Sequence, residues 1–256
     1  PYMYYSYSVP IPFKVGSINW FHLSNVLPLI SHSGYGLSLF RSIELKWLGK
    51  LFKKSYKNVE VISAESNYSL NLLPSSSKYV GIVSPNGSDK EIELFGQSRE
   101  YKVNNIAVIV GTFFYKDLEA SYKVFLKLKE IHKELKMVIV GISSMIPSEI
   151  VSDKSIVAIG EITHEEVISL LSAAKFYINT SKVENSWNSA SEGVLLASES
   201  YISRIEPHFE LVKTIANNNY VFDGDLIHIK RKNISVDKLM DWSDIIKNMI
   251  KLGKTL

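Results

Sequence analysis

Two glutamates, Glu184 and Glu192, are separated by seven residues in the stretch Glu-Asn-Ser-Trp-Asn-Ser-Ala-Ser-Glu. An apolar run at 176–178 precedes the stretch, and an apolar, helix-like run at 193–197 follows it. Open α/β sheets bind ligands where a strand ends and a helix begins. The start of that helix offers free backbone N–H groups and a positive dipole end to an anion. The pattern therefore favours a phosphorylated, hydroxyl-rich ligand such as a nucleotide-sugar.

Part of this stretch also has a purely structural interpretation. Ser189 and Glu192 have the Ser-x-x-Glu spacing of a helix capping box, which needs no ligand. Thr163 and Glu166 have the related Thr-x-x-Glu spacing, and we interpret them as a structural cap. Spacing alone leaves both interpretations of Glu192 open. No capping rule accounts for Glu184.

Composition narrows the class of protein. The chain has 256 residues, of which 46% are hydrophobic and 21% charged, as in a globular protein of one large or two ordinary domains. It contains no cysteine, which excludes disulfide scaffolds and cysteine-bound zinc and favours a cytoplasmic setting. The net charge of +3 is too small to indicate nucleic-acid binding. Residues 2–9 read as a strand already in progress, so we expect the chain to be a piece of a longer protein.

Apolar runs alternate with helical patterns along most of the chain. The first half has a helical period at 37–56 and expected strands at 18–21, 59–62 and 79–83. Residues 84–104 are polar and irregular, and we place a domain boundary there. Beyond it, helices at 118–135 and 164–174 alternate with strands at 106–110, 137–140, 156–159 and 176–178. This alternation predicts a parallel, doubly wound sheet with right-handed crossovers.

The turn after the strand at 106–110 holds a second candidate site. Gly111 would let the backbone approach a ligand closely, and Lys116 could neutralise a diphosphate there. The alternative is an ordinary strand–turn–helix connection with a solvated lysine.

Several landmarks follow one another in a recognisable order. They are Val110-Gly111 with Lys116, Val-Ile-Val-Gly at 138–141, Ile-Gly-Glu-Ile-Thr-His-Glu-Glu at 159–166, and Asn179-Thr180-Ser181-x-x-Glu184. Together with the Glu-x7-Glu pair, this order resembles the retaining family-4 glycosyltransferases, particularly those of bacterial surface-polysaccharide (O-antigen and capsule) synthesis. Further matches are Asn86-Gly87, Ile205-x-Pro207-His208-x-Glu210 and the closing segment 241–246.

The resemblance implies a GT-B fold, an α/β architecture of two Rossmann-like domains with parallel sheets. Residues 1–100 would be the C-terminal part of the acceptor-side domain, residues 101–232 the donor-binding domain, and residues 233–256 a helix that packs back toward the first domain. The first three strands of the acceptor-side domain, with their glycine-rich loop, would then lie upstream, which would leave this domain incomplete.

The resemblance also assigns roles to residues. The implied catalytic residues are Glu184 on the donor sugar, His22 near that sugar and Lys116 on the diphosphate. The alternative for His22 is a hydrogen-bonded histidine at the end of a strand, with a structural role. The implied donor-binding residues are Glu192 on the ribose, Ile162 at the base, and Gly111, Thr112, Asn188, Ser189, Ala190 and Ser191. No cofactor or metal is expected beyond the nucleotide-sugar. Asp223-Gly224-Asp225 imitates the Asp-x-Asp metal motif of other glycosyltransferases, but we interpret it as a turn.

Three residues depart from the family pattern. Thr112 stands where the family usually has an arginine, and Asn185 and Trp187 stand where it usually has glycines. Trp187 would crowd the donor sugar or stack on an acceptor. The expected function is transfer of a sugar from a nucleotide-diphosphate sugar to a glycan or lipid-linked acceptor. The alternatives are a non-catalytic glycosyltransferase-like subunit that binds nucleotide or a partner, and a nucleotide-sugar epimerase of GT-B fold.

A basic segment lies within the helical period at 37–56 and just beyond it. Its lysines recur at helical spacing and would share one face, with Trp47, Leu48, Leu51 and Phe52 largely on the other; they are Lys46, Lys50, Lys53, Lys54 and Lys57. Such a helix can lie on an anionic membrane surface, which would place the protein peripherally on the cytoplasmic face of the inner membrane. The alternative is a surface helix whose apolar face belongs to the core.

Overall fold

The computed structural model describes residues 2–31, 35, 37–74, 78–86, 103–216, 218–235, 239 and 241–255. The chain divides into two compact units. The first comprises Pro1–Gly87, Glu184–Ser186 and Met240–Leu256, and the second comprises Ser88–Val183 and Trp187–Leu239. Three residues of the Glu-x7-Glu stretch thus group with the first unit. The domain boundaries expected at 100 and 232 stay predictions, and most of the irregular stretch at 84–104, with Gly87, lies outside the described residues.

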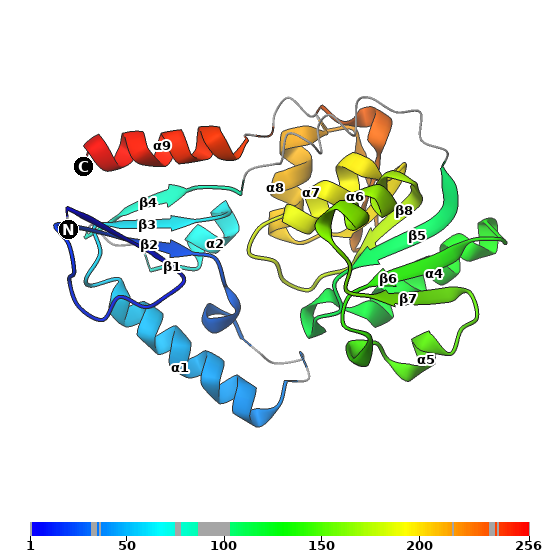
Figure 1. Ribbon diagram of the computed structural model, residues 1–256, viewed down its shortest axis with the longest axis horizontal. Coiled ribbons are helices and arrows are strands. Elements are labelled where there is room, and N and C mark those ends of the chain that lie inside the picture. Colours follow the sequence, from blue (N-terminus) through cyan, green and yellow to red (C-terminus); the bar gives the residue numbers. More distant parts are fainter. Residues whose placement is uncertain are drawn as a thin grey trace. The chain divides into compact units, whose positions relative to one another are not determined.

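The first unit is built on a parallel sheet with the strand order β1-β2-β3-β4 (Figure 1). The strands are β1 (Met3–Tyr7), β2 (Ile18–Leu23), β3 (Val61–Ala64) and β4 (Val80–Val83). All residues of β2 and β3 are buried, including the polar Asn19, His22 and Ser63, as expected for strands of a parallel sheet that is covered on both faces. The opening strand expected within residues 2–9 is confirmed as β1.

Helices cover both faces of this sheet. They are η1 (Leu27–Leu29), α1 (Leu39–Ser55), α2 (Asn67–Asn71) and α9 (Trp242–Thr255). On one face, Met249 and Leu252 of α9 pack against a cluster that contains Trp20 of β2. On the other, Phe52 of α1 meets Phe21 of β2 edge to face, with ring centroids 5.2 Å apart. Alternate residues of β2 therefore serve opposite layers, and Trp20 and His22 share the face that α9 covers.

The second unit holds a seven-stranded sheet with the order β10-β11-β9-β8-β5-β6-β7. Its strands are β5 (Asn104–Val110), β6 (Lys136–Val140), β7 (Ile156–Gly160), β8 (Ala174–Asn179), β9 (Glu199–Ser203), β10 (Tyr220–Asp223) and β11 (Leu226–Lys230). Residues of α6 (His164–Ser172), α7 (Asn188–Leu196) and α8 (Glu206–Ile215) form one core cluster. A second cluster includes residues of α4 (Leu118–Ile131) and α5 (Ser148–Val151). Short 3-10 turns complete the unit; they are η2 (Phe114–Lys116), η3 (Ser143–Met145) and η4 (Arg231–Asn233).

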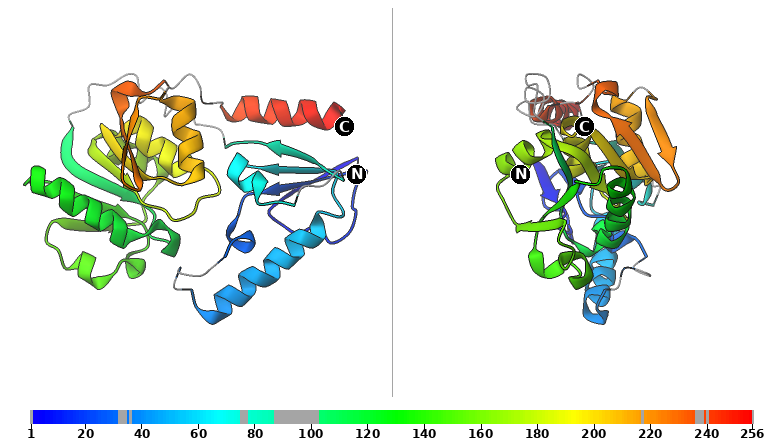
Figure 2. Two further views of the ribbon diagram at one scale, coloured as in Figure 1. Left: turned by 180° about the vertical axis from the view of Figure 1, so that it is seen from behind. Right: turned by 90° about the vertical axis from the view of Figure 1, so that its right-hand side faces the viewer.

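The expected parallel sheet needs one correction. Strands β5 to β9 pair in parallel, but β11 runs antiparallel to β9, and β10 runs antiparallel to β11. This hairpin, orange in Figure 2, forms one edge of the sheet. Gly224 and Asp225 form its two-residue turn directly after Asp223, the last residue of β10, so the interpretation of that motif as a turn is confirmed.

Candidate functional site

Lys116 lies in η2, the turn that follows β5, and its ammonium reaches the first turn of α7. The side chain is 8% exposed, and Nζ donates a hydrogen bond to Ser189 Oγ at 3.2 Å. Gly111, at the end of β5, has φ +91°, and a Cβ there would lie 3.1 Å from Lys116 Cε. A side chain at 111 would therefore both strain the backbone and press on the lysine stem. Lys116 is held in place, and the alternative of a solvated lysine is wrong.

The end of β8 fixes the turn that carries Lys116. Thr180 Oγ1 donates to the carbonyl oxygens of Lys116 and Asp117, at 3.3 and 2.8 Å. The backbone N–H of Lys182 donates to the carbonyl of Tyr115 at 2.8 Å. Asp117 has φ +50° and caps α4 by accepting from the N–H of Ala120 at 3.3 Å. Residues after β5 and after β8 thus meet at the carboxyl edge of the sheet, where parallel strands bind ligands.

The helix of the Glu-x7-Glu stretch, α7, begins at Asn188, and its N-cap residue Trp187 makes no side-chain capping bond. Ser189 is therefore the second residue inside the helix, so the capping-box interpretation of Ser189 and Glu192 is wrong. Tyr177 anchors this first turn, since its hydroxyl donates to the Ser189 carbonyl at 2.9 Å. The capping box of Thr163 and Glu166, by contrast, is confirmed at the start of α6.

Glu192 lies on α7 opposite the start of α6. Its Oε1 is 3.0 Å from Nε2 of His164, and the Glu192 side chain is 20% exposed. His164 follows Ile162 by two residues, and Ile162 is half-buried against the core of the unit. The carboxylate expected to hold the ribose therefore reaches the segment expected to meet the base. His164 was not singled out in the sequence, although its place at a helix start after β7 was a usable signal.

The remaining donor-site residues divide by exposure. In the first turn of α7, Asn188 is exposed and Ser189 half-buried, whereas the Ala190 and Ser191 side chains are buried. A ligand at this turn would therefore be bound by backbone N–H groups and by the side chains of Asn188 and Ser189. Thr112 is 4% exposed, and its hydroxyl donates to the Ile142 carbonyl at 3.2 Å. The Thr112 side chain thus links two strand ends.

Trp187 does not project toward a ligand. It is buried, with 8% of its surface exposed, in the core cluster that includes Ala190 and Val194 of α7. The expectation that Trp187 crowds the donor sugar or stacks on an acceptor is therefore wrong. The physical reason is that burying a large aromatic ring in the core is more favourable than leaving it in solvent at the start of a helix.

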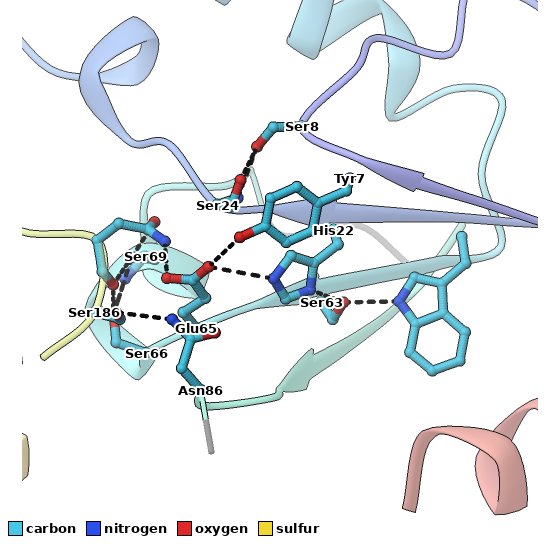
Figure 3. Close-up of polar contacts among 12 residues, drawn as sticks. Tyr7, Ser8, His22, Ser24, Ser63, Glu65, Ser66, Ser69, Asn86 and Ser186 are labelled. Atoms are coloured by element: carbon cyan, nitrogen blue, oxygen red, sulfur yellow. Dashed lines mark hydrogen bonds and ion pairs between the residues drawn. The ribbon is translucent and has the colours of Figure 1, made fainter. Parts of the chain in front are cut away.

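His22 ends up in a buried polar cluster of the first unit. Its Nδ1 lies 2.7 Å from Ser63 Oγ, and its Nε2 lies 3.6 Å from Oε1 of Glu65 (Figure 3). Glu184 is half-buried, and its neighbour Asn185 donates from Nδ2 to Glu65 Oε2 at 2.6 Å. Sequence reasoning missed Glu65. The signal for it was a carboxylate directly after the apolar strand β3, the kind of position that carried Glu184.

Within the described residues, no group of three or more His, Cys, Asp or Glu side chains is placed to hold a metal ion. Across that same part of the chain, every helix is too short or too polar to cross a bilayer.

Comparisons with known proteins identify the fold. No family model matches the sequence, and no curated protein matches it. Among solved structures, the chain is similar to a mutant of TarM from S. aureus in complex with fondaparinux, alpha-GlcNAc-glycerol and UDP, with 12% identity and a TM-score of 0.59 over 93% of this chain and 44% of that one. It is also similar to WaaG, a glycosyltransferase involved in lipopolysaccharide biosynthesis, with 10% identity and a TM-score of 0.51 over 72% of this chain and 55% of that one.

A third similar structure is the sucrose-phosphate synthase of Thermosynechococcus elongatus, with 12% identity and a TM-score of 0.50 over 69% of this chain and 47% of that one. The chain thus spans about half the length of these three structures. Because the sequence identity is only 10–12%, what the chain shares with these structures is the arrangement of strands and helices. The chain has the α/β fold with parallel-rich sheets of the GT-B glycosyltransferases.

Proposed function

We propose that this chain is part of a retaining glycosyltransferase that moves a sugar from a nucleotide-diphosphate sugar to a glycan or lipid-linked acceptor. The observation that supports this most directly is the position of Lys116. Its ammonium is held beside Ser189 in the first turn of α7, next to Gly111 at the end of β5. A buried cation and a helix N-terminus at one place favour a phosphate group more strongly than either does alone.

The two glutamates have different roles in this proposal. Glu184 accepts hydrogen bonds from hydroxyls of the donor sugar, and Glu192 accepts them from the ribose. Glu192 lies within α7, whereas Glu184 precedes the first residue of that helix. We therefore assign the two carboxylates to different ends of one nucleotide-sugar rather than to a pair acting on one bond. His22 serves the sugar side, and the segment at Ile162 meets the base.

The chemistry that this arrangement supports is electrostatic. Breaking the bond between the sugar and the diphosphate leaves additional negative charge on the departing oxygen. Lys116 and the backbone N–H groups of residues 188–191 are preorganised donors for that charge. No metal ion is required in this proposal, because the lysine and the helix N-terminus supply the positive potential.

The biological setting belongs to the same proposal. We infer synthesis of a bacterial surface polysaccharide by a protein bound peripherally at the cytoplasmic face of the inner membrane. The main alternative is a non-catalytic subunit that binds nucleotide. Thr112 favours that alternative, because it replaces an arginine expected on the diphosphate and donates to Ile142 instead. Trp187, which replaces a glycine of the family pattern, also motivates that alternative, but its ring is buried in the core of the second unit. A GT-B epimerase remains the third candidate.

Changing Glu184 to alanine is expected to abolish most of the transfer. Two hydrogen bonds from sugar hydroxyls to a carboxylate are worth about 3 kcal/mol together, so kcat/KM should fall by roughly 100-fold. The measurement is transfer or hydrolysis by the full-length protein, with a donor found by thermal shift among UDP-, GDP-, ADP- and CMP-sugars.

The matched control for this experiment is Glu119→Ala, which removes an exposed glutamate of α4. It should leave kcat/KM within twofold of wild type. Nucleotide binding without turnover of any donor would favour the non-catalytic subunit. A flat thermal response to every nucleotide and nucleotide-sugar would remove the basis of the proposal.

Helix α1 supports the membrane part of the proposal, although its exposed face differs from the one expected from the sequence. Lys46, Lys50, Lys53, Lys54 and Lys57 are exposed, as expected. Trp47, however, is 61% exposed, so its expected place on the face opposite the lysines is wrong. Leu39, Phe40 and Ile43 are exposed as well, whereas Leu45, Gly49 and Phe52 form the buried face. Apolar side chains beside lysines are the combination that binds an anionic lipid surface.

Replacing Lys46, Lys50 and Lys53 together with glutamine is expected to weaken vesicle binding strongly. Each lysine near an anionic surface contributes about 1 kcal/mol, so partition onto vesicles of phosphatidylglycerol should fall by about two orders of magnitude. Trp47→Ser should weaken binding to anionic and zwitterionic vesicles alike, because it removes apolar contact rather than charge. Sedimentation with vesicles measures both.

The control is a second triple variant that removes equal charge from the second unit, Lys123→Gln with Lys127→Gln and Lys133→Gln. All three lysines are exposed there. Equal losses in the two triple variants would show that net charge, not α1, sets the binding.

A further inference from the structure

Glu65 is a buried carboxylate with several partners. It follows β3 directly, and its side chain is 5% exposed. Its Oε1 accepts a hydrogen bond from the Tyr7 hydroxyl at 3.1 Å, and its Oε2 accepts one from Asn185 Nδ2 at 2.6 Å. Burial, together with the charge of Glu65 and the hydrogen bond to it, raises the pKa of Tyr7 against the opposing effect of Ser24. The Tyr7 hydroxyl therefore remains a donor at neutral pH.

His22 is oriented from both sides of its ring. Trp20 Nε1 donates to Ser63 Oγ at 2.7 Å, so the Ser63 proton can point at His22 Nδ1, also 2.7 Å away. Nε2, on the other side of the ring, faces Glu65 Oε1. The Tyr7 ring stacks on the imidazole with centroids 5.1 Å apart and an interplanar angle of 10°. Figure 3 shows Tyr7, His22 and Glu65 together.

The same carboxylate holds the main chain next to Glu184. Besides its bond to Glu65, Asn185 accepts from Ser66 Oγ and Ser69 Oγ at its carbonyl, each at 2.8 Å. Ser69 Oγ also lies 3.0 Å from Asn185 Oδ1. One residue further on, Ser186 Oγ accepts from Asn86 Nδ2 at 3.1 Å. Side-chain hydrogen bonds thus hold residues 185 and 186 within the first unit. A glycine at position 185 would lose those that the Asn185 side chain makes.

A buried carboxylate is an inefficient way to gain stability. Its desolvation costs several kcal/mol, and well-packed apolar residues often replace such groups without loss. What the arrangement does supply is order, because Glu65 fixes a ring on one side and a backbone segment on the other.

We propose that Glu65 and Asn185 are positioning residues that fix the main chain at Glu184 for recognition of the donor sugar. This inference rests on the proposed function. Glu65 contacts His22 and Asn185, and Asn185 is bonded covalently to Glu184, so both candidate sugar-binding residues depend on one carboxylate. The nucleotide, which we assign to Lys116 and Glu192, does not depend on it.

The test compares Asn185→Ala and Glu65→Gln with wild type in the full-length protein. Amide hydrogen exchange in the peptide covering 183–188 should become at least about tenfold faster in both variants. Binding of UDP-glucose, UDP-N-acetylglucosamine and GDP-mannose is measured beside UDP and GDP. The Kd of the preferred sugar nucleotide, divided by the Kd of its diphosphate, should rise about tenfold, as expected for loss of one charge-assisted contact.

Asn58→Ala is the matched control. Asn58 Nδ2 donates to the Ile11 carbonyl at 3.0 Å in the same unit, far along the chain from Glu184. This variant should change neither exchange at 183–188 nor the Kd ratio. If Glu65→Gln fails to fold, Ser69→Ala takes its place in the test. It leaves Glu65 intact and should also make exchange at 183–188 faster.

Each outcome separates the inference from the proposed function. Unchanged exchange in Asn185→Ala would overturn the positioning role. Faster exchange with an unchanged Kd ratio would overturn the link to the sugar, while the proposed function stands. A wild-type protein that binds none of these probes would overturn the proposed function, and the inference with it, before any variant is compared.

Discussion

Lys116→Met is expected to reduce kcat/KM for sugar transfer by two to three orders of magnitude, about the cost of removing one preorganised donor from a developing anion. The Lys116 ammonium is held at the first turn of α7 by Ser189 and by the passage of its stem over Gly111. Methionine keeps an unbranched apolar stem in that passage while removing the charge. The loss should therefore report electrostatics at the diphosphate.

The measurement is steady-state transfer by the full-length protein, with thermal unfolding as a check on folding. Lys182→Met is the control, because Lys182 pairs with Asp117 at 3.1 Å near the same turn but is 44% exposed. We expect its kcat/KM to stay within a few fold of wild type. If Lys116→Met keeps more than half of the activity, the diphosphate does not bind at this turn.

Gly193→Ala is expected to destabilise the second unit by about 3 kcal/mol, the upper part of the usual range for overpacking a core. A Cβ at position 193 would lie 2.2 Å from Cδ1 of the Tyr177 ring. That ring is fully buried and tied by its hydroxyl to the carbonyl of Ser189, so it has little freedom to turn away. The helix α7 would have to move off β8 instead.

Differential scanning calorimetry of the full-length protein measures this effect, and the unfolding temperature should fall by roughly 6–12 °C. Gly81→Ala provides the comparison, since the nearest side-chain atom to a Cβ there, Leu70 Cδ1, is 3.4 Å away. That variant should unfold within about 2 °C of wild type. An equally small change in the unfolding temperature of Gly193→Ala would contradict the close packing of α7 against the Tyr177 ring of β8.

The alternation of strands and helices in the second unit was predictable because burial on both faces makes parallel strands continuous apolar runs. The expected strand at 106–110 is β5, and the helix expected from 118 is α4. The meeting of Lys116 with the first turn of α7 could also be anticipated, because turns after parallel strands gather at one edge of the sheet.

The beginning of α7 was harder to predict. Periodicity marks apolar residues, and the helical run became visible only from Gly193, five residues after the helix starts. Residues 188–191 are Asn, Ser, Ala and Ser, which are common in both helix starts and loops. Ser-x-x-Glu spacing then indicated a cap that the helix does not use. Trp187 was misplaced for a related reason, since its burial depends on the core cluster it joins.

Contacts between distant parts of the chain were beyond local patterns. Glu65 and Asn185 are 120 positions apart, and no periodicity relates them. For α1, the lysines are exposed, but the choice of the buried face depends on the sheet beneath the helix. Phe52 packs on Phe21, and Trp47 is left on the surface.

The antiparallel hairpin β10–β11 affects how well this edge of the sheet tolerates amino-acid substitution. A further parallel strand would need a crossover of a dozen or more residues, usually helical, whereas the hairpin turns in two residues. Tyr201 and His228 stack here with their ring centroids 4.4 Å apart. A hollow of about 880 Å³ is lined by Tyr201 together with Lys127 and Arg204. Side chains that line a hollow can be exchanged without repacking a core. We therefore expect this edge to tolerate substitution better than the opposite face, where α7 and α8 are packed tightly.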